Sequence, residues 1–116
     1  MKLLLTSSGL TTDAIRRALV DLLGRPIANC TAVHIPTAVY ALPGGLGYAT
    51  EVTRYWADLG RRELRTCELT ALPTLPEELW LPELQAADAI LVTDGSNGYL
   101  SCATTSDPPR PGRCQL

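Results

Sequence analysis

Short apolar runs of strand length alternate along the chain with segments in which apolar residues recur every three or four positions. The apolar runs cover Lys2 to Ser7, Thr31 to Ile35, roughly Glu63 to Leu69, and Ala89 to Thr93. Such an alternation is typical of a parallel sheet whose strands are connected by crossover helices. The pattern therefore predicts an α/β fold with a doubly wound parallel sheet of about four strands.

Right-handed crossovers with one early reversal predict the strand order 2-1-3-4 for this sheet. Lys2 to Ser7 is almost continuously apolar, which suits a strand covered on both faces, whereas Glu63 to Leu69 alternates charged and apolar residues and suits a wet face or edge. In this order Ala89 to Thr93, the fourth strand, is an edge of the sheet. It lacks the charges and prolines that usually protect an edge, so we expect a further element to cover it.

Three helices are predicted between the strands. The first has apolar residues at helical spacing and ends at Gly24, where a left-handed exit is available. The second follows a loop over Tyr40 to Leu46 and ends at Gly60. The third spans Glu77 to Ala87, and Pro82 is expected to kink or interrupt it, since a proline inside a helix costs about 3 kcal/mol.

Composition excludes several classes of function. A chain of 116 residues with 46% hydrophobic and 19% charged residues suits one globular domain. The net charge of -2 lacks the basic surplus that nucleic-acid binding requires, so nucleic acid is not an expected partner. No apolar run is long enough for a signal peptide or a membrane span, and the expected compartment is the cytoplasm.

The cysteines and the single histidine do not indicate a metal site. Cys30, Cys67, Cys102 and Cys114 are widely spaced, form no Cys-x-x-Cys pair and have only His34 to join them. Metal and redox motifs need closer spacing, so we interpret these residues as buried or incidental thiols. No metal and no cofactor are expected.

Phosphate-binding and nucleophilic motifs are absent as well. The single lysine, Lys2, lies in a predicted strand, which excludes a Walker loop, and Gly44-Gly45-Leu46-Gly47 lacks the full dinucleotide spacing and is interpreted as a turn. His34 is the one candidate base, but its place within a strand favours a half-buried structural residue. No Gly-x-Ser-x-Gly elbow accompanies it, so no catalytic residue is assigned.

Three motifs in order resemble the amino-terminal half of the aspartyl dipeptidase (dipeptidase E) and cyanophycinase family. They are Leu3-Leu4-Leu5-Thr6-Ser7-Ser8-Gly9, Ala32-Val33-His34-Ile35-Pro36-Thr37-Ala38 and Ala86-Ala87-Asp88-Ala89-Ile90-Leu91-Val92-Thr93. The resemblance implies a class I glutamine amidotransferase-like, flavodoxin-like fold and a serine peptidase acting on small peptides.

The resemblance also implies an oxyanion loop after the last predicted strand. Gly95 falls on the second glycine of the family's Gly-Gly-Asn motif, and Ser96 stands where asparagine is expected, so these two residues are the oxyanion-loop candidates. Asp94 replaces the first glycine, and its carboxylate would oppose negative charge developing there. An ordinary Asp94-Gly95 turn is the competing interpretation.

The family's serine, histidine and acidic partner have no counterpart in the chain. Residues 1–93 follow the family pattern. Residues 94–116 are rich in proline and show neither the helical nor the strand period of apolar residues, so they are interpreted as an irregular tail. One hypothesis is that a frameshift or truncation begins near Asp94. It fails if no other reading frame of the coding DNA restores the family's continuation.

Three hypotheses for function remain. The first is the amino-terminal part of a serine-type dipeptidase that handles small aspartyl peptides and is inactive as this chain. The second is a non-catalytic α/β module that associates, for instance as a homodimer, through the exposed edge of Ala89 to Thr93. The third, small-ligand binding at the carboxyl ends of the strands, is allowed by the topology but lacks a supporting charged cluster.

Overall fold

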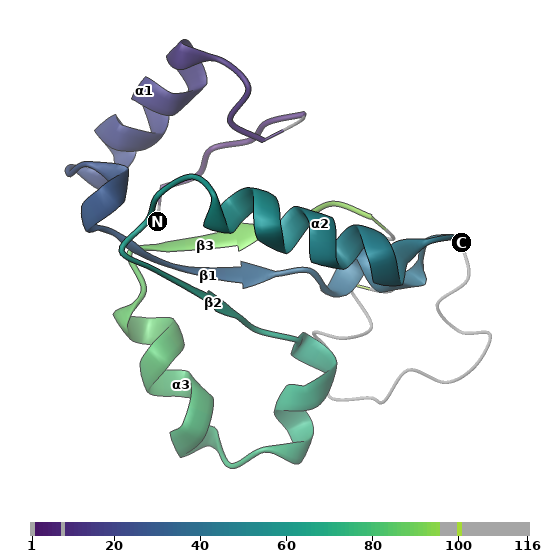
Figure 1. Ribbon diagram of the computed structural model, residues 1–116. Coiled ribbons are helices and arrows are strands. Elements are labelled where there is room, and N and C mark those ends of the chain that lie inside the picture. The colour runs from purple at the N-terminus through teal and green to yellow at the C-terminus, as the bar shows by residue number, and fades with distance from the viewer. Residues whose placement is uncertain (1, 8, 96–99, 101–116) are drawn as a thin grey trace.

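The computed structural model describes residues 2–7, 9–95 and 100. Helices and strands alternate over most of this range (Figure 1). The helices are α1 (Asp13–Leu23), α2 (Gly45–Ala57) and α3 (Glu77–Ala86), and the strands are β1 (Thr31–Ile35), β2 (Glu63–Thr66) and β3 (Ala89–Val92). Short 3-10 helices lie at η1 (Ile27–Asn29), η2 (Thr37–Ala41) and η3 (Leu69–Thr74).

The three strands form a parallel sheet in the order β2-β1-β3. In the register, Val33 of β1 lies between Arg65 of β2 and Ile90 of β3. Every residue of β1 is buried, because this central strand has a neighbour on each side and cover on both faces. The α/β class and the parallel sheet are thus confirmed.

Helices α2 and α3 lie on opposite faces of the sheet. His34 contacts Thr53 of α2, whereas Val33, which points to the other face, shares a cavity wall with Trp80 of α3. The chain runs from β1 outward to β2 through α2, then returns past β1 to β3 through α3. Because crossovers of one hand place helices on opposite faces when the direction reverses, this arrangement is a small doubly wound unit.

The first predicted strand is absent, and the predicted order is wrong. Residues 2–6 are irregular, and Leu3 and Leu5 are 68% and 82% exposed. The sequence predicted an inner strand at Lys2 to Ser7 and an edge strand at Thr31 to Ile35. In the structure Thr31–Ile35 is the central strand, and it pairs directly with Ala89–Val92. A continuous apolar run predicts that a segment is buried. It does not predict which of two such runs becomes the central strand of the sheet.

The two edge strands of the observed sheet, β2 and β3, agree more closely with the sequence prediction than residues 2–7 do. β2 is shorter than predicted, because Leu69 belongs to η3, and its two ends are exposed as expected for an edge. β3 pairs with β1 alone among the described residues, and Ile90 and Val92 are each 54% exposed. The fourth predicted run is therefore an edge strand among the described residues, but its neighbour is β1 and not, as predicted, the run from Glu63 to Leu69.

The helices were predicted accurately except at two places. α1 has Thr12 as its N-cap, whose hydroxyl accepts from the amide of Ile15, and it ends at Gly24 in the left-handed region. α2 already begins at Gly45, so the glycine-rich stretch interpreted as a turn lies mostly in the first turn of this helix. α3 continues through Pro82, so the proline does not interrupt this helix.

No helix among the described residues is both long enough and apolar enough to span a membrane.

Candidate functional site

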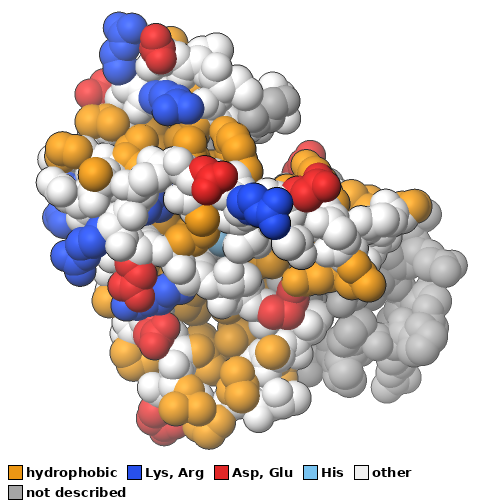
Figure 2. Space-filling model, in the orientation of Figure 1, with side chains coloured by type: hydrophobic (Ala, Val, Ile, Leu, Met, Phe, Trp, Pro, Cys, Tyr) orange, Lys and Arg blue, Asp and Glu red, His pale blue; other side chains and the backbone are white. Residues whose placement is uncertain are grey.

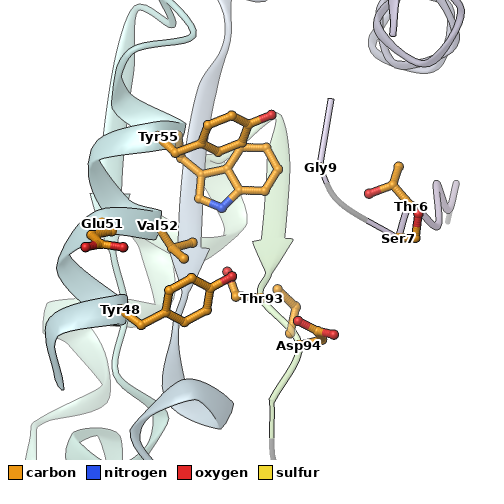
Figure 3. A pocket seen from close by; sticks show the side chains of 11 residues that line it. Thr6, Ser7, Gly9, Tyr48, Glu51, Val52, Tyr55, Thr93 and Asp94 are labelled. Atoms are coloured by element: carbon orange, nitrogen blue, oxygen red, sulfur yellow. The ribbon is translucent and has the colours of Figure 1, made fainter. Parts of the chain in front are cut away.

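A cavity of about 430 Å³ lies beside the carboxyl end of β3 (Figure 3). Three parts of the chain surround it: the amino-terminal segment, one face of α2 and the end of β3. The lining residues are Thr6, Ser7, Gly9, Tyr48, Glu51, Val52, Tyr55, Trp56, Val92, Thr93 and Asp94. This is the position at which parallel α/β sheets bind their ligands, and the volume lies in the usual range for small-molecule sites.

Helix α2 supplies the aromatic wall of the cavity. Tyr48, Val52 and Tyr55 follow one another at intervals of three or four residues and therefore lie on one helix face. In Figure 3 the side chains of Tyr48 and Tyr55 extend from α2 towards β3, whereas the carboxylate of Glu51 lies on the outer side of the helix. The rings of Tyr55 and Trp56 meet edge to face, with centroids 5.1 Å apart.

Tyr55 also holds the amino-terminal segment over the cavity. Its hydroxyl accepts a hydrogen bond of 2.9 Å from the amide of Leu10. Gly9, immediately before, has φ +74°, and a Cβ at that position would lie 2.9 Å from the Tyr55 hydroxyl oxygen. Arg16 fixes the same turn through a 3.2 Å bond from Nε to the carbonyl of Leu10. The position of the amino-terminal segment beside the cavity thus depends on a glycine, Gly9, in the left-handed region.

His34 lies beneath this cavity and is completely buried. The hydroxyl of Thr53 donates to the carbonyl of Ala49 at 2.9 Å, so toward His34 Nδ1, 3.3 Å away, it can only accept. The ring proton is therefore on Nδ1, and Nε2 accepts from the hydroxyl of Thr93 at 2.7 Å. Burial, and after it the positive charge of Arg61, lowers the pKa of His34 from 6.5 to about 4.

The hydrogen-bonded pair His34 and Thr93 is arranged like a catalytic base and its nucleophile. Two features of the pair favour a structural role instead. A base with a pKa near 4 is too weak to remove a hydroxyl proton at neutral pH. The group that orients it, Thr53, is a neutral hydroxyl, where hydrolytic triads have a carboxylate or an amide. The pair connects β1 to Thr93 directly after β3, and His34 is completely buried, where the sequence predicted a half-buried residue.

Gly95, one of the two oxyanion-loop candidates, packs closely against the loop after β1. A Cβ on Gly95 would overlap the carbonyl of Ala38 and lie 2.9 Å from the amide nitrogen of Val39. Close packing against the loop after β1 therefore requires a glycine here, and Gly95 is not among the residues that line the cavity. Ser96, the other oxyanion-loop candidate, lies outside the described residues.

The loop after β1 forms a second polar cluster away from the cavity. Thr37 donates from its hydroxyl to Glu68 Oε1 at 2.6 Å and accepts from the amide of Leu69 at 3.1 Å. These bonds tie the end of β1 to the beginning of η3. Thr37 is fully buried, so it acts as a brace between two loops and not as a binding group.

Sequence reasoning located the cavity only in part. It named Ser7 and Asp94 as residues at strand ends, and both line the cavity. Tyr55 and Trp56 lie on one face of the predicted second helix, but no binding role was predicted for that face. Tyr48 was missed, although its spacing of seven residues from Tyr55 gave the signal. Among the described residues, no group of three or more His, Cys, Asp or Glu side chains could hold a metal ion.

Comparison of the chain with protein-family models, with curated proteins and with solved structures gave no match. The likeness to the dipeptidase family therefore rests on the three sequence motifs alone.

Proposed function

We propose that the chain binds a small peptide in the cavity between α2 and the end of β3, and that it does not hydrolyse this ligand. The observation that carries the proposal is the position of a cavity of about 430 Å³ at the carboxyl end of the sheet. The resemblance to the amino-terminal half of a serine dipeptidase supports a peptide as the ligand. Within the described residues, the one histidine is too weak a base to activate a nucleophile.

Tryptophan fluorescence offers a direct test. Trp56 lines the cavity and Trp80 lies on the other face of the sheet, so Trp80→Phe leaves a single reporter. Titration with alanyl-leucine should change the emission saturably, with a dissociation constant of about 0.1–1 mM for a ligand of this size. Chromatography of the same mixtures should show intact dipeptide.

A pair of variants controls for nonspecific binding. Thr6→Tyr places a large ring in the cavity and should abolish the fluorescence change. Thr11→Tyr makes the same change at an exposed position outside the lining and should leave binding unaltered. Absence of saturation with the parent protein, or hydrolysis of the dipeptide, would overturn the proposal.

A second candidate function is association through β3. Ile90 and Val92 lie on the same face of the sheet as Val33 and Ile35. The two β1 residues are buried, whereas the two β3 residues are each 54% exposed. Among the described residues β3 pairs with β1 alone, and a strand with an unpaired edge and an exposed apolar face favours pairing with a second copy of the chain.

Light scattering coupled to size exclusion tests this association. A dimer mass should appear at high protein concentration, and Ile90→Lys should return the mass to that of a monomer. Leu46→Lys changes an exposed leucine on α2, at 75% exposure, and should leave the dimer intact. A monomer mass at every concentration would exclude this function.

A further inference from the structure

The cavity beside β3 has walls of one electrostatic character. Asp94 supplies a negative charge at the end of β3, whereas the carboxylate of Glu51 lies on the outer side of α2, and no Lys or Arg is found among the described lining residues. The nearby guanidinium of Arg16 is bound to the carbonyl of Leu10. That of Arg61 donates to the carbonyl of Trp56 at 2.8 Å and lies over the indole, 5.4 Å from the ring centre.

Aromatic rings reinforce this negative character. The faces of aromatic rings carry partial negative charge and attract cations. Tyr48 and Tyr55 both project into the space between α2 and β3, and Asp94 follows β3 on the opposite side of that space (Figure 3). Trp56 already has a cation against its ring in Arg61, which leaves the two tyrosines as the rings available to a ligand.

The hydroxyl groups of the cavity fit the same kind of ligand. Thr6 and Ser7 lie across from α2 and can accept hydrogen bonds. An ammonium group has three donors and no acceptor, so carboxylate and hydroxyl oxygens satisfy it. A carboxylate ligand would instead meet Asp94, and none of the described lining residues carries a positive charge to offset the repulsion.

We propose that the cavity recognises a positively charged amine, which in a peptide is the free amino terminus, with the ammonium group beside Asp94 and against the rings of Tyr48 and Tyr55. This inference rests on the proposed peptide-binding function and adds the orientation of the ligand. It also gives Asp94 a role: the residue that is unfavourable beside an oxyanion is favourable beside a cation.

Two matched probes test the inference: alanyl-leucine amide, which carries a free amine, and N-acetyl-alanyl-leucine amide, which is neutral. Titration of the Trp80→Phe protein should show at least tenfold tighter binding of the free amine. Asp94→Asn should remove most of that preference and change binding of the acetylated probe less than twofold. Asp21→Asn, on the exposed side of α1, is the matched control and should leave both affinities unchanged.

The outcomes separate the inference from the proposed function. Equal binding of the two probes would overturn the recognition of an amine while leaving peptide binding in place. Binding of neither probe would overturn both. If Asp94→Asn weakened both probes equally, Asp94 would act on the shape of the cavity and the charge argument would fail. Raising NaCl from 0.05 to 0.5 M should also reduce the preference for the free amine, because salt screens partly exposed charges.

Discussion

His34 is a buried base whose two ring nitrogens are both used for structure. Its Nδ1 donates to Thr53 and its Nε2 accepts from Thr93, so one residue of β1 contacts both α2 and the end of β3. Protonation would place a positive charge on a fully buried ring near the positive Arg61, and the Thr93 hydroxyl, which donates to the neutral ring, would have to turn and accept instead. The folded state therefore requires the neutral ring.

This requirement predicts a pH dependence of stability. The pKa of His34 is about 4 in the folded protein and 6.5 in the unfolded chain, so between these values the unfolded state binds the extra proton. The contribution of His34 to the free energy of unfolding is fully present above about pH 6.5. It is lost as the pH drops towards 4, and the loss is roughly 3 kcal/mol at most. Urea denaturation at pH 7, 6 and 5 measures this slope.

The replacement His34→Gln provides the comparison. Glutamine keeps a donor and an acceptor but has no proton to gain, so the slope between pH 6.5 and 5 should flatten even if the variant is less stable overall. An unchanged slope in His34→Gln would assign the pH dependence to carboxylates. The chain contains one histidine, so no other imidazole complicates the experiment.

At the scale of elements, helix α2 begins with two glycines in opposite situations. A Cβ on Gly45 would overlap the carbonyl oxygen of Val39 in η2, whereas a Cβ on Gly47 would meet no atom within 4 Å. Gly45→Ala should therefore destabilise the protein by about 1–3 kcal/mol through overpacking. Gly47→Ala should stabilise it by about 0.5–1 kcal/mol through helix propensity.

Thermal denaturation of the two variants tests this contrast within one turn of one helix. The midpoint should fall for Gly45→Ala and rise for Gly47→Ala. A similar shift in both would mean that helix propensity alone governs this turn, and that η2 does not pack closely against the start of α2.

The elements that could be predicted from sequence are those with local signals. Helix α1 carries its cap, its apolar stripe and its terminal glycine within thirteen residues, from Thr12 to Gly24. The position of residues 2–7 depends instead on competition between strands for neighbours, which no local pattern contains. The cavity was partly missed for a related reason: an apolar face on α2 has the same spacing whether it meets a core or an open space.

At the scale of the whole molecule, residues 2–7 contribute little to the core. Leu5 is 82% exposed, whereas Val33 on the central strand is 2% exposed. Leu5→Ala should change the free energy of unfolding by less than about 0.5 kcal/mol, and Val33→Ala should cost roughly 1–3 kcal/mol. Urea denaturation of the two variants distinguishes the observed sheet from the predicted one, because a central strand at residues 2–7 would make Leu5→Ala the costly change.

The pairing of β1 sets an order of assembly. Its partner on one side, β2, is separated from it only by η2 and α2, so Thr31 finds Glu63 across a moderate length of chain. Its partner on the other side, β3, comes after η3 and α3 as well. Pairing β1 with β3 therefore closes a longer loop of chain, and closing it costs more conformational entropy.

During synthesis the β1–α2–β2 segment is made before β3. Thr93 follows β3 directly, so the hydrogen bond from its hydroxyl to His34 is among the last to form. The wall of the cavity that contains Thr93 and Asp94 is therefore completed only when the third strand has docked.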